Sequence, residues 1–157
     1  MNIKLIAIGK TDNKSLQTLI DDYQKRLSHY IKFDLEIIPD IKNVKNLSET
    51  QQKEKEGELI LSKISHTEQL ILLDENGKHF SSVAFADELQ KKMNSGIKTL
   101  VFVIGGPYGF SETVYQKSTG KISLSSMTFS HQMVRLFFIE QLYRGFTILR
   151  NEPYHHQ

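Results

Sequence analysis

The chain has 157 residues, enough for one domain with its own hydrophobic core, and its 20 basic and 18 acidic residues leave a formal charge of only +2. Cysteine is absent, which excludes disulfides and thiolate sites, and the small charge permits RNA or an acidic partner without requiring either. The apolar start at residues 3–8 contains Lys4 and is too short for a signal peptide or membrane span, so we expect a cytoplasmic protein with no membrane partner.

The first half of the chain alternates strand and helix patterns. Residues 2–8 predict a strand, and apolar residues spaced by three and four predict a helix over 13–29. Residues 33–38 alternate in polarity before Pro39 and predict a strand nearer a sheet edge, followed by a solvated loop at 40–46. Residues 48–64 predict a very polar helix, mostly facing water and anchored by Leu47, Leu59, Ile60, Leu61 and Ile64.

The second half continues the alternation. Residues 69–74 predict a buried strand with an exit turn at 75–78, and residues 81–93 predict a helix. Residues 99–104 have no polar face and predict the central strand of a parallel sheet. A short helix at 111–117 and a short strand at 121–124 follow. This order predicts one α/β domain over residues 1–157, with helices on both faces of a mostly parallel sheet.

A glycine loop, Gly105-Gly106-Pro107-Tyr108-Gly109, follows the predicted central strand, at the edge where such sheets bind ligands. Its spacing matches neither the dinucleotide fingerprint nor the phosphate loop. Pro107 lacks an N–H donor, Glu112 falls in the first turn of the next helix if Ser111 caps it, and no lysine is near. The loop therefore favours a neutral or cationic ligand over a triphosphate, although a tight turn without a ligand explains it equally well.

The last third contains a loop of hydroxyl and apolar residues at 124–130 and a long helix at 131–150. This helix is apolar on almost every side, so it must be buried on every side. One side can pack on its own sheet and the other on a second copy, which predicts a homodimer. We expect Gly145 to allow close backbone approach across that interface. Pro153 ends the helix and leaves a polar tail at 152–156.

Several polar residues are candidates for a site, and each also has a structural explanation. Glu140 and Arg144 have the spacing of an ion pair within a helix. Arg135 fits a buried structural cation, and an interface histidine is a better account of His131 than a catalytic base. Asp74 ends a strand and suits either a ligand contact or a turn. The adjacent His155 and His156 lack the spacing of a pair of metal ligands, so we predict no metal.

Five segments form a specific pattern in this order: Leu72-Leu73-Asp74 with Gly77-Lys78; Ile104-Gly105-Gly106-Pro107-Tyr108-Gly109; Leu124-Ser125-Ser126-Met127-Thr128-Phe129-Ser130-His131; Arg135 followed by Glu140-Gln141-Leu142-Tyr143-Arg144; and Asn151-Glu152-Pro153-Tyr154-His155. Over essentially the whole chain they resemble the RlmH family, bacterial 23S rRNA pseudouridine N3-methyltransferases of the SPOUT superfamily.

The resemblance implies a compact α/β fold whose carboxyl-terminal segment forms a trefoil knot, and a homodimer. General topology rules count knots as nearly absent, so chain physics alone does not predict this one. The resemblance also implies S-adenosylmethionine as the cofactor, held by three loops. The matching residues are Leu73, Gly105, Gly106, Leu124, Ser125, Ser126, Met127, Thr128 and Phe129. A sulfonium cofactor carries no phosphate, which agrees with the acidic, lysine-free glycine loop.

The implied substrate is a pseudouridine of 23S rRNA in the assembled ribosome. Its N3 must lose a proton before it attacks a methyl group, and positive charge beside the base stabilises that anion. The candidates near the target base are Arg144, Tyr154 and His155, with His131 and Arg135 second, and which group takes the proton stays open. The tail can lie over a cofactor pocket, either that of its own chain or that of the partner subunit. The alternatives are a non-catalytic RNA-binding module and a flavodoxin-like nucleotide enzyme.

Overall fold

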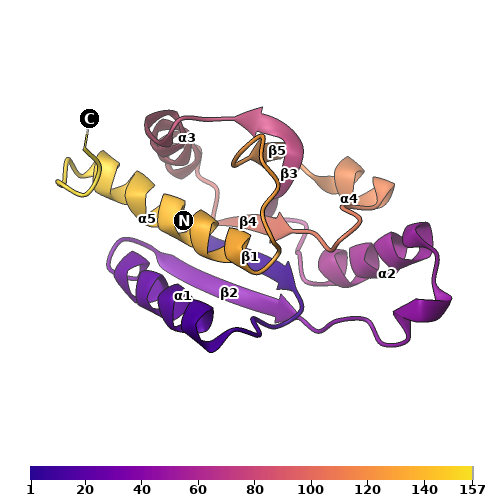
Figure 1. Ribbon diagram of the computed structural model, residues 1–157. Helices are drawn as coiled ribbons and strands as arrows, with labels where there is room; N and C mark the ends of the chain where they lie inside the picture. Colours follow the sequence, from indigo (N-terminus) through magenta and orange to yellow (C-terminus); the bar gives the residue numbers. More distant parts are fainter. Residues whose placement is uncertain (157) are drawn as a thin grey trace.

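The computed structural model describes residues 1–156, which form five parallel strands flanked by helices (Figure 1). The strands are β1 (Asn2–Ile8), β2 (Lys32–Ile38), β3 (Gln69–His79), β4 (Thr99–Ile104) and β5 (Gly120–Ser123). Their order in the sheet is β2-β1-β4-β3-β5. β4 is central and β2 lies at an edge, as predicted. The predicted fold class, a mostly parallel sheet flanked by helices, is confirmed, while the knot and the dimer stay predictions.

Helices cover both faces of the sheet, as the strand pattern predicted. On one face α5 (Met133–Leu149) lies between α1 (Lys14–Leu27) and α3 (Ser82–Asn94) (Figure 1). On the other face are α2 (Glu49–Ser62) and α4 (Glu112–Lys117), and a 3₁₀ turn at Val44–Asn46 precedes α2. Every residue of β4 from Leu100 to Ile104 is buried, because both faces are covered. None of the helices in residues 1–156 is long and apolar enough to cross a membrane.

The helices begin at the polar residues that cap them. Asn13, Ser48, Ser81 and Ser111 each accept a hydrogen bond from a backbone N–H in the first turn, which satisfies a donor that the helix leaves unpaired. Ser48 forms a full capping box with Gln51. The expected helix bounds are therefore correct to within about two residues at each end.

Two expectations about the fold are wrong. Residues 75–78 do not end β3 as a simple turn, because β3 resumes its pairing with β5 at Lys78 and His79 after an irregularity that begins at Leu73. Gly145 does not approach a second copy. A Cβ at that position would lie 3.0 Å from Cδ1 of Leu89 and 3.8 Å from Cα of Ala86, both on α3 of the same chain.

The long apolar helix is only partly buried within one chain. Phe138, Ile139, Leu142 and Phe146 are buried against the sheet and the neighbouring helices. Met133 and Phe137 are 39% and 37% exposed, and Met127 in the preceding loop is 77% exposed. A surface that includes large apolar side chains is therefore available to a partner, which keeps the dimer prediction open.

Candidate functional site

The carboxyl ends of parallel strands meet at one edge of the sheet, and a cavity of about 470 Å³ lies there. Three segments form most of its walls: the irregular part of β3 at residues 73–76, the end of β4 with the glycine loop at residues 104–110, and the end of β5 with the hydroxyl loop between residues 122 and 129. These are the three segments that the sequence assigned to the cofactor. Eight of the nine predicted cofactor residues line the cavity: Leu73, Gly105, Gly106, Leu124, Ser125, Met127, Thr128 and Phe129. Ser126 does not line it.

The charge of the cavity lining is one-sided. Asp74 and Glu75 contribute carboxylates, whereas no lysine or arginine is among the lining residues in the described part of the chain. Ser111 caps α4 and Glu112 lies in its first turn, as the sequence predicted. A phosphate would meet repulsion here, because nothing positive balances these acidic groups. The cavity therefore fits a neutral or cationic ligand.

The glycine loop is a tight turn. Gly109 donates its N–H to the carbonyl of Gly106 at 3.1 Å, and its φ of +79° is a conformation that favours glycine. A Cβ at Gly105 would lie 3.1 Å from the ring of Phe110. A Cβ at Gly106 would lie 2.3 Å from the carboxylate of Glu56. Within the chain, Gly106 therefore makes room for a side chain of helix α2.

Asp74 serves as a turn residue at the exit of the paired part of β3. Its Oδ1 accepts a hydrogen bond from the backbone N–H of Asn76 at 2.8 Å, and its Oδ2 accepts one from the hydroxyl of Tyr115. Burial and this bond raise the pKa of Tyr115 to about 12, so the phenol stays protonated at neutral pH. Both carboxylate oxygens are thus engaged, and they hold this wall of the cavity in place.

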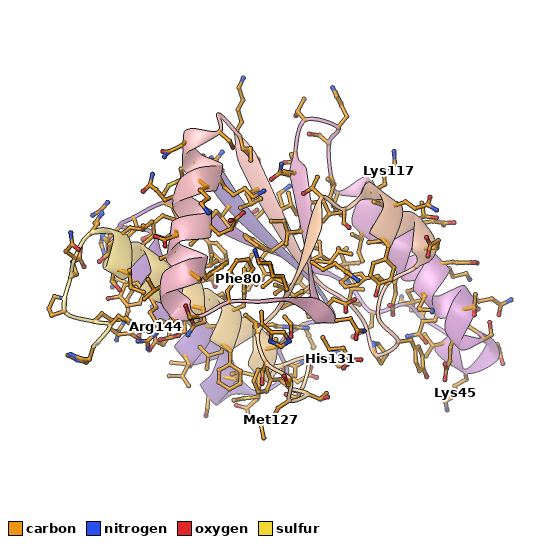
Figure 2. All side chains as sticks on the ribbon, turned by 90° about the horizontal axis from the view of Figure 1, so that it is seen from above. Lys45, Phe80, Lys117, Met127, His131 and Arg144 are labelled. Carbon is orange, nitrogen blue, oxygen red and sulfur yellow. The ribbon has the colours of Figure 1, made fainter. Side chains whose placement is uncertain are left out.

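The hydroxyl loop forms the third wall through local hydrogen bonds. The Oγ of Ser125 accepts from the backbone N–H of Met127 at 2.9 Å, and the hydroxyl of Ser123 donates to the carbonyl of Ser125 at 2.9 Å. The ring of Phe129 packs on Phe137 with centroids 4.9 Å apart. These contacts leave Met127 projecting outward (Figure 2).

The predicted catalytic residues form a separate cluster at the end of α5. Glu140 accepts hydrogen bonds from the guanidinium of Arg144 and, at 2.9 Å, from the hydroxyl of Tyr154. The guanidinium also lies over the Tyr154 ring, 4.7 Å from its centroid, and Nη1 lies 3.2 Å from Nδ1 of His155. The hydroxyls of Tyr154 and Tyr23 are 3.0 Å apart. The ion pair expected from spacing is therefore present, and it is part of a larger tail cluster.

This tail cluster (Glu140, Arg144, Tyr154 and His155) is not at the cavity of its own chain. Arg144 is ten residues after Val134, which lines the cavity, so about 15 Å of helix separates them at 1.5 Å per residue. Figure 2 shows Arg144 well apart from Met127 and His131. One chain therefore forms the cofactor cavity and forms the tail cluster, but it does not bring the tail cluster to the cavity.

Comparison with known proteins identifies the family of the chain. The family profile described as Predicted SPOUT methyltransferase matches residues 1–155. The chain belongs to the SPOUT methyltransferase family. It is 89% identical to a protein of Flavobacterium johnsoniae, 67% to one of Christiangramia forsetii and 63% to one of Parabacteroides distasonis, each over 100% of both chains. All three relatives are named Ribosomal RNA large subunit methyltransferase H. The resemblance inferred from five motifs is confirmed.

The two second-rank candidates, His131 and Arg135, lie in different surroundings. His131 lines the cavity at the start of the α5 region. Arg135 is 1% exposed and donates hydrogen bonds to the carbonyls of Ile8 and His131 and to the hydroxyl of Thr11. Burial lowers its pKa. Arg135 is the buried structural cation that the sequence allowed, because it ties α5 to the end of β1. No group of three or more potential metal ligands lies together in residues 1–156.

Glu56 lies near the site, and the sequence pattern did not predict that it would be buried there. The polar helix was expected to bury only aliphatic residues, yet Glu56 is 3% exposed while the expected anchor Leu59 is 40% exposed. Gly57 beside it lets α2 approach closely, since a Cβ there would lie 2.4 Å from Oγ of Ser111. A glycine inside a charged helix was the available signal, because it marks a close contact more often than an exposed turn.

Proposed function

We propose that this protein is an S-adenosylmethionine-dependent methyltransferase that acts on N3 of a pseudouridine in 23S rRNA, with the assembled ribosome as its substrate. The full-length relatives named as large-subunit rRNA methyltransferases support the reaction class and the substrate. The observation that carries the cofactor assignment is the cavity built by three segments, whose lining in the described part of the chain contains acidic residues but no lysine or arginine. We expect the protein to work in the cytoplasm, where ribosomes are.

The cavity suits the parts of this cofactor. Leu73, Leu124 and Phe129 give apolar walls for an adenine ring, and the exposed backbone groups of the loops can hydrogen-bond its edge. The acidic lining suits the ammonium group and the positively charged sulfur of the cofactor, whose net charge is positive although its amino-acid end also carries a carboxylate. When bound, S-adenosylmethionine supplies a methyl group on a positively charged sulfur.

The tail cluster suits the other reactant. Loss of the N3 proton leaves a negative charge on the base, and the guanidinium of Arg144 can stabilise it. The pKa of Tyr154 is raised by burial and by its hydrogen bonds with Tyr23 and Glu140, so this phenol keeps its proton at neutral pH. The hydroxyl donates that proton to Glu140, so Tyr154 orients the carboxylate that pairs with Arg144. His155, in contact with Arg144, completes a surface of donors for the carbonyl edge of the base.

We propose that the protein works as a homodimer in which the tail cluster of one chain lies over the cavity of the other. Two observations support this arrangement: Arg144 lies about 15 Å along α5 from Val134 at the cavity of the same chain, and Met127, Met133 and Phe137 expose apolar surface near the cavity. A second copy can cover the apolar surface and bring its tail cluster to the cavity.

Mixing two inactive variants tests the shared site. We expect Gly106→Val to remove cofactor binding and Arg144→Ala to remove catalysis. A heterodimer of the two would contain one site with both defects and one intact site, so mixing should restore activity well above either variant alone. If each site is built from one chain, no site in the mixture is intact and activity stays absent. Refolding the two chains together ensures that subunits exchange.

Arg144→Ala tests the chemistry directly. We expect single-turnover methyl transfer to ribosomes to fall about a hundredfold or more, the scale of losing a group that stabilises the transition state, and deletion of residues 154–157 to act similarly. Affinity for S-adenosylhomocysteine should fall far less. Arg26→Ala is the matched control, because Arg26 also pairs with a carboxylate four residues away and lies over a tyrosine ring. Equal rates in the Arg144 and Arg26 variants would leave Arg144 without a catalytic role.

Ligand binding separates the alternatives. An RNA-binding module should bind neither S-adenosylmethionine nor S-adenosylhomocysteine, and a nucleotide enzyme should bind ATP or NAD through its phosphates. The acidic lining predicts that ATP and NAD bind no better than adenosine. Tight, phosphate-dependent binding of either would contradict the methyltransferase proposal.

A further inference from the structure

Glu56 has an unusual environment for a carboxylate. It lies on α2 and is 3% exposed. Its Oε1 accepts a hydrogen bond from the side-chain amide of Gln52 at 3.0 Å, whereas its Oε2 is buried without a hydrogen-bond partner among the described residues. Buried polar atoms are nearly always paired, because an unpaired one loses its water without compensation. This oxygen therefore needs an explanation beyond the fold of the free chain.

The unpaired oxygen lies directly behind the glycine loop. A Cβ built on Gly106 would lie 2.3 Å from Oε2 and 2.7 Å from Oε1, so nothing but this glycine's hydrogen fits between the loop and the carboxylate. Gly106 itself lines the cavity. The carboxylate is thus one glycine backbone away from the ligand space without being part of its surface.

The groups around Glu56 do little to stabilise its ionised form, so a positive charge from outside this set is needed to keep the carboxylate ionised. Burial raises the pKa of Glu56, the hydrogen bond from Gln52 opposes that shift, and the charges that act on it are those of Asp40, which raises it further, and His131, which lowers it. No arginine or lysine pairs with it within residues 1–156. A cation placed in the cavity would supply the missing positive charge.

We propose that Glu56 is the counter-charge for the cationic cofactor and makes the site prefer S-adenosylmethionine, whose sulfonium is positive, over S-adenosylhomocysteine, whose sulfur is neutral. The inference rests on the proposed function. Glu56 is a specificity residue and not a catalytic one, because it lies behind the loop and touches no reacting atom. Methyl transfer removes the positive charge from sulfur, so the same carboxylate that helps bind the substrate stops holding the product.

Asp74 and Glu75 also lie at the cavity, but they are less suited to this discrimination. Both oxygens of Asp74 already accept hydrogen bonds, and Glu75 is exposed, so water screens its charge. Glu56 is buried and only one of its two oxygens accepts a hydrogen bond, so little water lies between its carboxylate and the cavity to screen it. Unit charges roughly 10 Å apart at an effective dielectric constant of about 20 change binding by about tenfold.

The test compares the affinities for the two ligands in matched variants. Calorimetry would give the Kd for S-adenosylmethionine and for S-adenosylhomocysteine with the wild type, Glu56→Gln and Glu58→Gln. Glu58 lies on the same helix and is exposed, so its variant makes the same charge change in water. We expect the preference for S-adenosylmethionine to fall about tenfold in Glu56→Gln and to stay within twofold in the control. Glu56→Asp, which keeps the charge, should retain most of the preference.

The other outcomes distinguish failure of the proposed role of Glu56 from failure of the methyltransferase proposal. An unchanged preference, or an equal loss of both affinities, would make Glu56 a support of the loop only and overturn the inference, while the methyltransferase proposal stands. A wild type that binds neither ligand would overturn both. Glu56→Met serves if the Gln variant does not fold, because a neutral side chain of similar length suits a buried position. Failure of both neutral variants to fold would make Glu56 structural and also overturn the inference.

Discussion

Gly106→Ala is the substitution whose effect the structure defines most closely. The added Cβ would lie 2.3 Å from Oε2, 2.7 Å from Oε1 and 2.7 Å from Cδ of Glu56, so the loop and the carboxylate must move apart by about 1 Å. The carboxylate is the end of a flexible side chain, but it is buried and held by Gln52. Overpacking of this kind destabilises by about 1–3 kcal/mol. Because the loop is the other movable part, it should shift toward the cavity.

Two measurements follow from that displacement. The thermal midpoint should fall by about 2–4 °C for each kcal/mol lost in a domain of this size, and the affinity for S-adenosylhomocysteine should fall at least tenfold. Gly106→Val, with two more methyl groups, should abolish binding. Gly120→Ala is the control, because a Cβ there meets nothing within 4 Å.

The double variant Gly106→Ala with Glu56→Ala tests the cause. Removing the carboxylate leaves room for the new Cβ, so the loss of stability in the double variant should be smaller than the sum of the two single losses by about 1 kcal/mol or more. Additive losses, measured by urea unfolding, would refute the argument that Glu56 is what the glycine accommodates.

Three further predictions concern residues that hold the elements around the site in place. Gly77→Ala should lower the free energy of unfolding by about 3 kcal/mol in urea denaturation, because its Cβ would lie 2.5 Å from the backbone of Ile122, which cannot yield as a side chain can; a loss under 1 kcal/mol would contradict this. The pKa of Tyr115 is raised to about 12, above its ordinary 10, so between these pH values the folded state keeps a proton that the unfolded state loses. The resulting stabilisation is complete below pH 10 and is lost as the pH rises through 12. Urea unfolding at pH 9 and pH 11 should therefore show a fall in stability for the wild type that is missing in Tyr115→Phe. Arg135→Leu should destabilise by about 2 kcal/mol or more, since it removes the hydrogen bonds by which this buried side chain ties α5 to the carbonyl of Ile8 and the hydroxyl of Thr11, and a midpoint equal to wild type would show that these groups find other partners.

The sequence predicted the fold best where the residues of a single element allow only one position in it. Residues 99–104 have no polar face, and only a central strand covered on both sides can bury them, so the position of β4 followed directly. The meeting of three loops then followed from geometry, because parallel strands bring their carboxyl ends to one edge. Capping serines gave the helix starts for the same local reason.

The errors have a common cause in contacts between segments distant in the sequence. Asn76-Gly77 has the local signature of a turn, but pairing of Lys78 with Ile122 continues β3 beyond it. Gly145 was assigned to a dimer contact because nothing along the helix indicated that α3 would lie against it. The burial of Glu56 depends on the glycine loop some fifty residues later, and helix periodicity carries no information on that neighbour.

The tail cluster shows the limit of motif matching. The resemblance brought Arg144, Tyr154 and His155 together, and the structure places them in contact. It did not show that their cluster lies about 15 Å along α5 from the cavity of the same chain. That separation is what turns a list of candidate residues into a testable statement about two chains.

The most direct test of the account is methyl transfer from labelled S-adenosylmethionine to ribosomes from a strain that lacks this gene, with naked 23S rRNA from the same strain as the second substrate. We expect the ribosomes to accept label at N3 of one pseudouridine in 23S rRNA, and the naked rRNA to accept far less. Absence of label from both substrates, under conditions where S-adenosylmethionine binds, or label on any atom other than a pseudouridine N3, would contradict the proposed function.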